Sequence, residues 1–127
     1  MDYLLDTHVV LWLAKNVSQL SENAKHTIFE TAGEKYVSIA SAWEVAIKVS
    51  AEKLRVEGGV AEFLRMVDEN GFFLLPIKTE YVERVQTLPF HHRDPFDRML
   101  IATAEAEGLS LITADTNIHS YDIPWVW

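Results

Sequence analysis

The feature of the sequence that most constrains its fold is an alternation of short apolar runs with longer amphipathic segments. Runs of strand length, such as Tyr3-Leu4-Leu5, are followed by segments in which apolar residues recur at helical spacing. Short strands that alternate with helices form a mainly parallel sheet with helices on both faces. The sequence therefore predicts an α/β fold with a mainly parallel central sheet.

The predicted elements follow one another without an internal repeat or a low-complexity tract. Strands are predicted at 3–5, 36–39, 72–75, 109–113 and 123–127. Helices are predicted at about 8–15, 21–32, 41–54, 60–69, 79–88 and 95–107. The segment 57–59 is too short for a domain linker and is predicted to be a turn. We expect a single domain that spans residues 1–127.

The charge balance, 11 basic against 19 acidic residues, gives a net charge of −8. It argues against a nucleic-acid binder with a basic face, because such a protein neutralises phosphates with Lys and Arg. If the substrate is a polyanion, a bound divalent metal ion is the obvious source of positive charge. The absence of cysteine excludes disulfides and thiolate metal sites. No signal peptide or membrane span is visible, so we expect a cytoplasmic protein.

The helix predicted at 95–107 has the clearest boundaries. Asp94 suits the N-cap position and Pro95 the first helical position. Asp97 follows three residues after the cap, where its charge favours the positive end of the helix. The small and apolar run 99–104 predicts burial on most sides, and Gly108 suits the C-terminal end. A buried helix that begins with two carboxylates is either a well-capped helix or one wall of an active site.

Four carboxylates occupy equivalent junctions between predicted elements. Asp6 ends the first strand, Asp115 follows the strand at 109–113, and Asp97 begins a helix. Glu44 is predicted in the first turn of the helix at 41–54, in a capping box with Ser41. Each acid taken singly is explained by helix capping. In a parallel sheet, however, the crevice beyond the carboxyl ends of the strands is where ligands bind, and residues far apart in sequence converge there.

Taken together, these four acids predict a metal site. Carboxylates brought close repel one another, and each tends to keep its proton unless a cation lies among them. Oxygen ligands without a His or Cys cluster suit Mg²⁺ or Mn²⁺ rather than zinc. Such sites activate water and stabilise the charge that develops during phosphodiester cleavage.

Four segments in register give the chain a family resemblance. They are Leu4-Leu5-Asp6-Thr7-His8, Ser41-Ala42-Trp43-Glu44, His92-Arg93-Asp94-Pro95-Phe96-Asp97-Arg98 with Leu100-Ile101-Ala102, and Leu111-Ile112-Thr113-Ala114-Asp115. On these segments the chain resembles PIN-domain ribonucleases, and most closely the VapC family of toxins from type II toxin–antitoxin systems. Their order and spacing agree over essentially the whole chain.

The resemblance implies a three-layer α/β/α fold and an Mg²⁺- or Mn²⁺-dependent endoribonuclease. The acidic quartet of the family corresponds to Asp6, Glu44, Asp97 and Asp115. By this resemblance Asp6 and Asp97 are the principal metal ligands, and Glu44 and Asp115 complete the site directly or through water. It also implies a homodimer and a cognate VapB-like antitoxin whose C-terminal segment covers the groove. The alternative is a non-catalytic PIN-like module that binds a partner.

Several charged residues near the acids have two interpretations. Asp94 is predicted to serve the helix rather than the metal. Arg93 and Arg98 flank the carboxylates and suit either a phosphate or the carboxylates themselves. Lys48, four residues after Glu44, is predicted to form a helix ion pair with it.

Uncharged neighbours of the acids are harder to assign. Thr7 and Thr113 suit the orientation of water or carboxylates, but also capping and strand-end hydrogen bonds. His8, His91 and His92 lack a convincing ligand spacing and are left outside the predicted metal site. The residues Trp43, Trp125 and Trp127 are predicted to lie in the core or a dimer interface rather than to stack on bases.

Overall fold

The computed structural model describes residues 1–127 and contains a five-stranded sheet in which every neighbouring pair is parallel. The strand order is β3-β2-β1-β4-β5. The bounds of the strands are β1 Tyr3–Leu5, β2 Lys35–Ser38, β3 Phe73–Leu75, β4 Ser110–Ile112 and β5 Trp125–Val126. All five predicted strands are present, so the prediction of a mainly parallel α/β sheet is confirmed.

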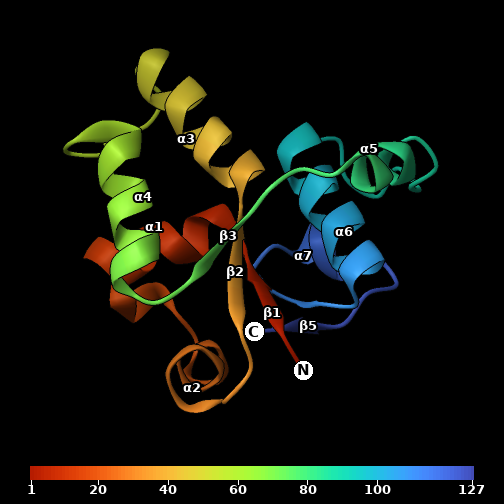
Figure 1. The fold of residues 1–127 in the computed structure, drawn as a ribbon, viewed down its shortest axis with the longest axis horizontal. Coiled ribbons are helices and arrows are strands. Elements are labelled where there is room, and N and C mark those ends of the chain that lie inside the picture. The colour runs from red at the N-terminus through yellow and green to blue at the C-terminus, as the bar shows by residue number, and fades with distance from the viewer.

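Helices cover both faces of this sheet. Their bounds are α1 Thr7–Lys15, α2 Glu22–Glu30, α3 Ile39–Ser50, α4 Gly59–Glu69, α5 Thr79–Val85, α6 Pro95–Glu107 and α7 Thr116–His119, with a 3-10 turn, η1, at Val17–Gln19. Figure 1 shows α1 and α4 on one side of the strands and α5 and α6 on the other, which gives the three layers. None of these helices is long and apolar enough to span a membrane.

The two faces of the sheet bury separate apolar cores. Successive side chains of a strand point to opposite faces. Leu5 and Ile112 accordingly pack into a core with α1 to α4, whereas Leu4 and Leu111 pack into a second core with α5, α6 and α7. All four side chains are fully buried. The central strands are therefore fixed from both sides, and with them the residues that follow their carboxyl ends.

Strand β1 lies at the point where the chain changes direction across the sheet. The chain runs from β1 through β2 to β3 on one side, and returns to pair β4 on the other side of β1. Adjoining strand ends with such a switch leave a crevice where ligands bind. Beyond β1 the ladder continues by one bond, from the Asp6 amide to the Ile112 carbonyl at 3.0 Å.

Helix α6 begins and ends as predicted. The Asp94 carboxylate accepts hydrogen bonds from the amides of Phe96 and Asp97, at 2.9 and 3.0 Å. Pro95 is the first helical residue, and Gly108 at the C-cap has a φ of 67°, a left-handed conformation that glycine adopts readily. The first turn of α6, which carries Asp97, is thus held by its own cap.

The helix that carries Glu44 begins earlier than predicted. Ser38, at the end of β2, is the N-cap, and its hydroxyl accepts a hydrogen bond from the Ala40 amide at 3.0 Å. The predicted capping box of Ser41 and Glu44 is therefore wrong, because both residues lie inside a helix that starts at Ile39. Glu44 belongs to the second turn of α3 rather than the first. Ser38 and Ser41 are both good caps by type, and the strand simply runs into the helix at the earlier one.

Smaller differences concern single residues. Phe29 is exposed on α2, and Lys78 occupies the N-cap of α5. The short helix α7 was not predicted as an element. Strand β2 begins and ends one residue earlier than its predicted run, and β3 and β4 are one and two residues shorter than theirs.

Candidate functional site

The four predicted acids lie on elements that meet at one edge of the sheet. Asp6 is the N-cap residue of α1 directly after β1, and Asp115 is the N-cap residue of α7 after β4. Glu44 lies on α3, which follows β2, and Asp97 lies in the first turn of α6. Asp6 and Glu44 are only 5% and 3% exposed. Acids buried to this degree need hydrogen-bond partners or a cation.

Asp6 is held by the neighbouring strand. The Thr113 hydroxyl donates to Asp6 Oδ2 at 2.7 Å, and the same hydroxyl oxygen accepts the Asp115 amide at 3.1 Å. Burial is the main cause that raises the pKa of Asp6, and the charges of Glu44 and Asp115 raise it further. Thr113 therefore orients the Asp6 carboxylate, which is one of the two roles that the sequence left open for this threonine.

Glu44 has both carboxylate oxygens engaged. The Thr7 hydroxyl lies 2.8 Å from Glu44 Oε1 and also 2.8 Å from the hydroxyl oxygen of Ser41. Lys48 Nζ lies 2.6 Å from Glu44 Oε2, so the predicted ion pair is confirmed. The hydrogen bond to Glu44 is the main cause that raises the pKa of Lys48. Lys48, on the same helix, thus supplies the positive charge that pairs with the Glu44 carboxylate.

Asp97 and Asp115 meet at a histidine that the sequence analysis excluded. His92 Nε2 lies 2.7 Å from Asp97 Oδ2 and 3.2 Å from Asp115 Oδ2. One donor atom from each of the three residues falls within 4.8 Å of the others. His92, which the sequence leaves outside the metal site, therefore contacts two of the predicted acids. Its position depends on an irregular loop before α6, where sequence spacing carries no regular geometry.

The acidity of Asp97 is also strongly perturbed. Burial raises its pKa to about 7, with further contributions from the charges of Asp6, Asp94 and Glu44 that outweigh the hydrogen bond from His92. A carboxyl that keeps its proton near neutrality for these reasons becomes fully ionised when a cation is bound beside it. Perturbation by burial and by neighbouring acids is typical of functional sites.

The donor atoms fit a hard divalent cation. Asp6 Oδ1 and Asp97 Oδ1 accept no hydrogen bond from the protein, whereas the other oxygen of each carboxylate does. No fully buried side-chain oxygen in the chain lacks a hydrogen-bond partner, so these two oxygens are open to solvent. Both oxygens of Asp115 are engaged, one with the Asn117 amide and one with His92. Two free carboxylate oxygens among further acids suit Mg²⁺ or Mn²⁺.

The two arginines near the acids differ in their roles. Arg98 is buried and donates to four backbone carbonyls and to the hydroxyl of Tyr121. It contacts no carboxylate, and it is too buried to bind a phosphate from solvent. Neither of the two roles that the sequence left open for Arg98 is therefore observed. The side chain of Arg93 is exposed and forms no ion pair. Among Lys48, Arg93 and Arg98, only Lys48 therefore forms an ion pair with one of the four acids.

The three tryptophans that were predicted to lie in the core or a dimer interface have different surroundings. Trp43, next to Glu44, is exposed and meets the Phe96 ring edge-on at 5.3 Å. Trp125 is also exposed and stacks on His119 with the rings 3.5 Å apart. Of these three tryptophans only Trp127 packs against a core, where Trp12 lies beside it.

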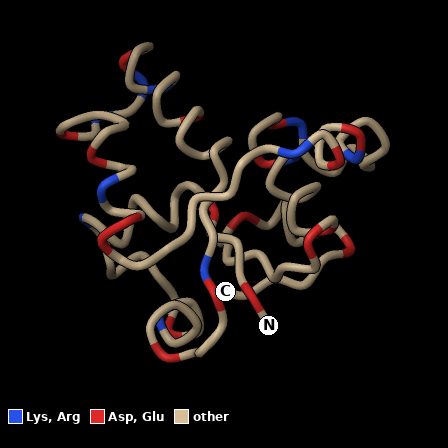
Figure 2. The backbone as a smooth tube through the Cα atoms, in the orientation of Figure 1, with Lys and Arg blue, Asp and Glu red and all other residues tan.

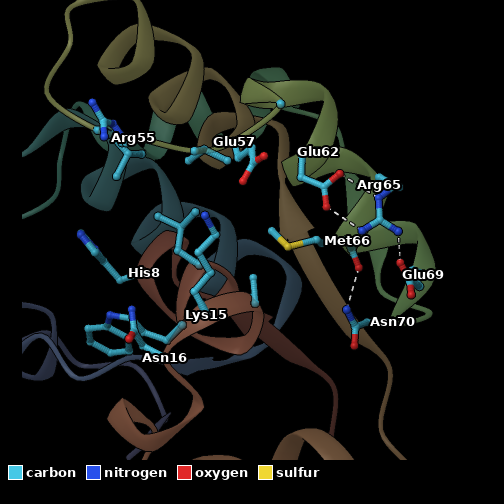
Figure 3. A pocket seen from close by; sticks show the side chains of 16 residues that line it. His8, Lys15, Asn16, Arg55, Glu57, Glu62, Arg65, Met66, Glu69 and Asn70 are labelled. Carbon is cyan, nitrogen blue, oxygen red and sulfur yellow. Dashed lines mark hydrogen bonds and ion pairs between the residues drawn. The ribbon is translucent and has the colours of Figure 1, made fainter.

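A hollow of about 760 Å³ opens between α1, α4 and the loop after α3. Figure 3 shows Met66 pointing into it from α4 and Lys15 from α1, with Arg55 and Glu57 on the loop. A second, smaller hollow of about 140 Å³ adjoins it and is lined by Glu44 and Lys48. His8, Leu11 and Leu54 line both hollows, so one groove leads from α4 to Glu44.

Comparison with known proteins agrees with this geometry. The sequence pattern of the PIN domain matches residues 3–124. The chain belongs to the PIN-domain family, in its VapC branch. It is 30% identical over 122 residues to Ribonuclease VapC22 of Mycobacterium tuberculosis, which covers 95% of this chain and 92% of that relative.

Solved structures of the family share the fold. VapBC2 from Rickettsia felis, bound to a DNA fragment from its promoter, matches with a TM-score of 0.71 and 12% identity, over 98% of this chain and 97% of that one. DNA-bound VapBC from Salmonella typhimurium matches with a TM-score of 0.69 and 18% identity, over 98% and 96% of the two chains. At such identities these matches establish the PIN fold alone.

Replacement of Asp97 by asparagine is expected to stabilise the metal-free protein at neutral and alkaline pH. From its ordinary value of 3.8, the pKa of Asp97 rises to about 7 on folding. Between these pH values the unfolded chain ionises while the folded one holds its proton, so the free energy of unfolding falls as pH rises and stays low above 7. Asp97→Asn escapes this loss and is expected to gain about 2 kcal/mol at pH 8.

Urea unfolding in EDTA at pH 8 and at pH 3 measures this effect. At pH 3 the Asp97 carboxyl is protonated in both the folded and the unfolded chain, so the gain in stability is expected to vanish. A variant that is less stable than the wild type at pH 8 would contradict the raised pKa.

Proposed function

We propose that this protein is an endoribonuclease toxin of a toxin–antitoxin pair. It hydrolyses RNA phosphodiester bonds at an Mg²⁺ or Mn²⁺ site built from Asp6, Glu44, Asp97 and Asp115. The observation that carries the proposal is the pair of uncommitted oxygens, Asp6 Oδ1 and Asp97 Oδ1, among buried acids in a PIN-domain chain. The name of the relative VapC22, a ribonuclease, supports the reaction.

The four acids have different tasks in this proposal. Asp6 and Asp97 hold the cation through their free oxygens, and Glu44 and Asp115 complete the site directly or through water. A bound divalent ion supplies an activated water and neutralises charge that develops on the phosphate. Thr113 and Thr7 fix the carboxylates of Asp6 and Glu44 through neutral hydroxyls, which do not compete with the ion for the site.

The surface charge is consistent with a site of this kind. Figure 2 shows Lys and Arg scattered among Asp and Glu rather than gathered on one face. With a net charge of −8, a basic face contributes little to the affinity for RNA. The metal ion is then the main positive charge offered to a phosphate.

The purified protein is expected to cleave cellular RNA with Mg²⁺ or Mn²⁺ and to stop when EDTA is added. Asp6→Asn and Asp97→Asn are each expected to lower the cleavage rate by at least about 100-fold, because each removes a proposed ligand charge. The matched control is Asp68→Asn, at an exposed aspartate of α4, which is expected to cleave at the wild-type rate. A folded Asp97→Asn protein with wild-type activity would rule out the mechanism.

The alternative, a non-catalytic PIN-like module that binds a partner, makes a different prediction for metal binding. Such a module gives no carboxylate-dependent heat when it is titrated with Mn²⁺. The proposed enzyme binds Mn²⁺, and Asp97→Asn abolishes that binding.

An antitoxin is the proposed protein partner. The structural neighbours include a toxin–antitoxin complex from Klebsiella pneumoniae, which matches with a TM-score of 0.66 and 20% identity. The groove between α1 and α4 offers a place for an antitoxin segment, because it is partly apolar and leads to Glu44 and Lys48. A segment bound along it would reach the acidic site and exclude RNA.

We expect a small DNA-binding protein to be encoded beside the gene for this chain, and the two proteins to form a complex when co-expressed. Met66→Glu, in the groove, is expected to weaken the complex at least about tenfold, because a buried charge there loses its solvation. The matched control is Val82→Glu, at an exposed valine of α5 on the other side of the sheet. Equal affinity of both variants in a titration would contradict this location.

A homodimer is the proposed state of the free protein. Ile39, Trp43 and Ile47 form a stripe along α3 with 37%, 58% and 40% of their surfaces exposed. Residues four apart lie on one face of a helix, so the three side chains form one apolar surface. Two chains that each carry a charge of −8 associate best through an uncharged face such as this stripe.

Light scattering coupled to gel filtration is expected to give twice the chain mass of 14.5 kDa. Trp43→Glu is expected to give the monomer mass, because it places a charge in the centre of the stripe. Phe29→Glu, at an exposed phenylalanine of α2, is the control and is expected to stay dimeric. A Trp43→Glu dimer would exclude this stripe as the interface.

A further inference from the structure

His92 joins two of the acids without belonging to the acidic quartet. Its Nε2 lies 2.7 Å from Asp97 Oδ2, in the first turn of α6, and 3.2 Å from Asp115 Oδ2, at the N-cap of α7. An imidazole beside two carboxylates has the composition of a metal-ligand set. It has equally the composition of a hydrogen-bond donor that orients ligands. The other ring nitrogen distinguishes the two roles.

The second ring nitrogen assigns the proton. His92 Nδ1 lies 3.1 Å from the backbone nitrogen of Arg93, which has a hydrogen to donate. A ring nitrogen that accepts a hydrogen bond carries no proton, so in the neutral imidazole the proton is on Nε2. Nε2 then donates to Asp97 Oδ2, and Asp115 Oδ2 lies in contact with it at 3.2 Å. For Nε2 to bind a metal ion, the proton would have to move to Nδ1, where it would face the Arg93 N–H.

The backbone of His92 is fixed independently of the acids. Its amide donates to the Tyr121 hydroxyl oxygen at 3.1 Å, and its carbonyl accepts from Arg98 Nη1 at 3.3 Å. The Tyr121 hydroxyl in turn donates to the Pro89 carbonyl at 2.6 Å. The backbone of His92 therefore places the ring, with its Nε2–H, in position before any ion or substrate binds.

The guanidinium of Arg98 holds the rest of this loop. It donates to the carbonyls of Val85, Leu88, Pro89 and His92 and to the Tyr121 hydroxyl. The Phe90 ring covers it, with its centroid 4.2 Å away. A buried cation whose two terminal nitrogens both bind backbone carbonyls makes a rigid brace, and the charge is directed at the loop instead of the acids.

We infer that His92 is a positioning residue, whose Nε2–H donates to Asp97 Oδ2, holds that carboxylate beside Asp115 and leaves Asp97 Oδ1 free for the cation. The inference rests on the proposed metal-dependent function and adds a residue to it. A single N–H donor is suited to this place, because the permanent charge of a Lys or Arg there would compete with the metal ion. Hydrogen bonds to ligating carboxylates characteristically support metal affinity from outside the ligand set.

Two measurements test His92. In the ¹⁵N-labelled protein, the chemical shifts of its ring nitrogens are expected to show the Nε2–H tautomer both without metal and with Mg²⁺. Titration with Mn²⁺ is expected to show at least about tenfold weaker binding for His92→Ala. His92→Gln is expected to restore most of the affinity, because an amide N–H reaches close to the position of Nε2. His26→Ala, at an exposed histidine of α2, is the control and is expected to bind as the wild type does.

The outcomes separate this inference from the proposed function. A proton on Nδ1 in the Mg²⁺-loaded protein would make His92 a ligand and overturn the inference, as would wild-type Mn²⁺ affinity in His92→Ala. In both cases the carboxylate site would stand if Asp97→Asn still abolished binding. If Asp97→Asn bound Mn²⁺ as well as the wild type, the proposed function would fail and the inference with it.

Discussion

Repulsion among carboxylates at one sheet edge is the constraint around which the structure is organised. Asp6 and Glu44 are buried almost completely, and burial and mutual charge raise the pKa values of Asp6 and Asp97. The fold opposes this repulsion with two threonine hydroxyls, an imidazole and a single contacting lysine, Lys48. Four acids with one contacting lysine leave the site electronegative.

The rigidity of the site comes from residues outside the four acids. Helix α6 is fixed by the Asp94 cap and by its buried apolar run, and the loop before it is fixed by Arg98. Rigid support of this kind holds functional groups to within fractions of an ångström. Asp94 and Arg98, which both lie next to catalytic candidates in sequence, are therefore structural residues with a functional consequence.

Local signals predicted the parts of the structure that local physics decides. The five strands, the cap of α6 and the Glu44–Lys48 pair depend on residues a few positions apart, and all are present as predicted. The start of α3 was missed because two serines of equal capping ability compete, and the strand decides between them. The contacts of His92 with Asp97 and Asp115 were not predicted, because the backbone of His92 is held by Tyr121, which approaches only in the folded chain. That the four acids form one metal site is still a prediction, for which the free oxygens of Asp6 and Asp97 provide the geometric basis.

The central position of β1 also decides when the site can exist during synthesis. The partner of Asp6 is Thr113, 107 residues further along the chain, and β1 has β2 on one side and β4 on the other. Contacts so distant in sequence form only after the intervening chain has been made. Asp6, the first of the four acids to be synthesised, therefore lacks Thr113 and Asp115 until the end of the chain has been made. A nascent chain remains without its acidic cluster until synthesis is nearly finished.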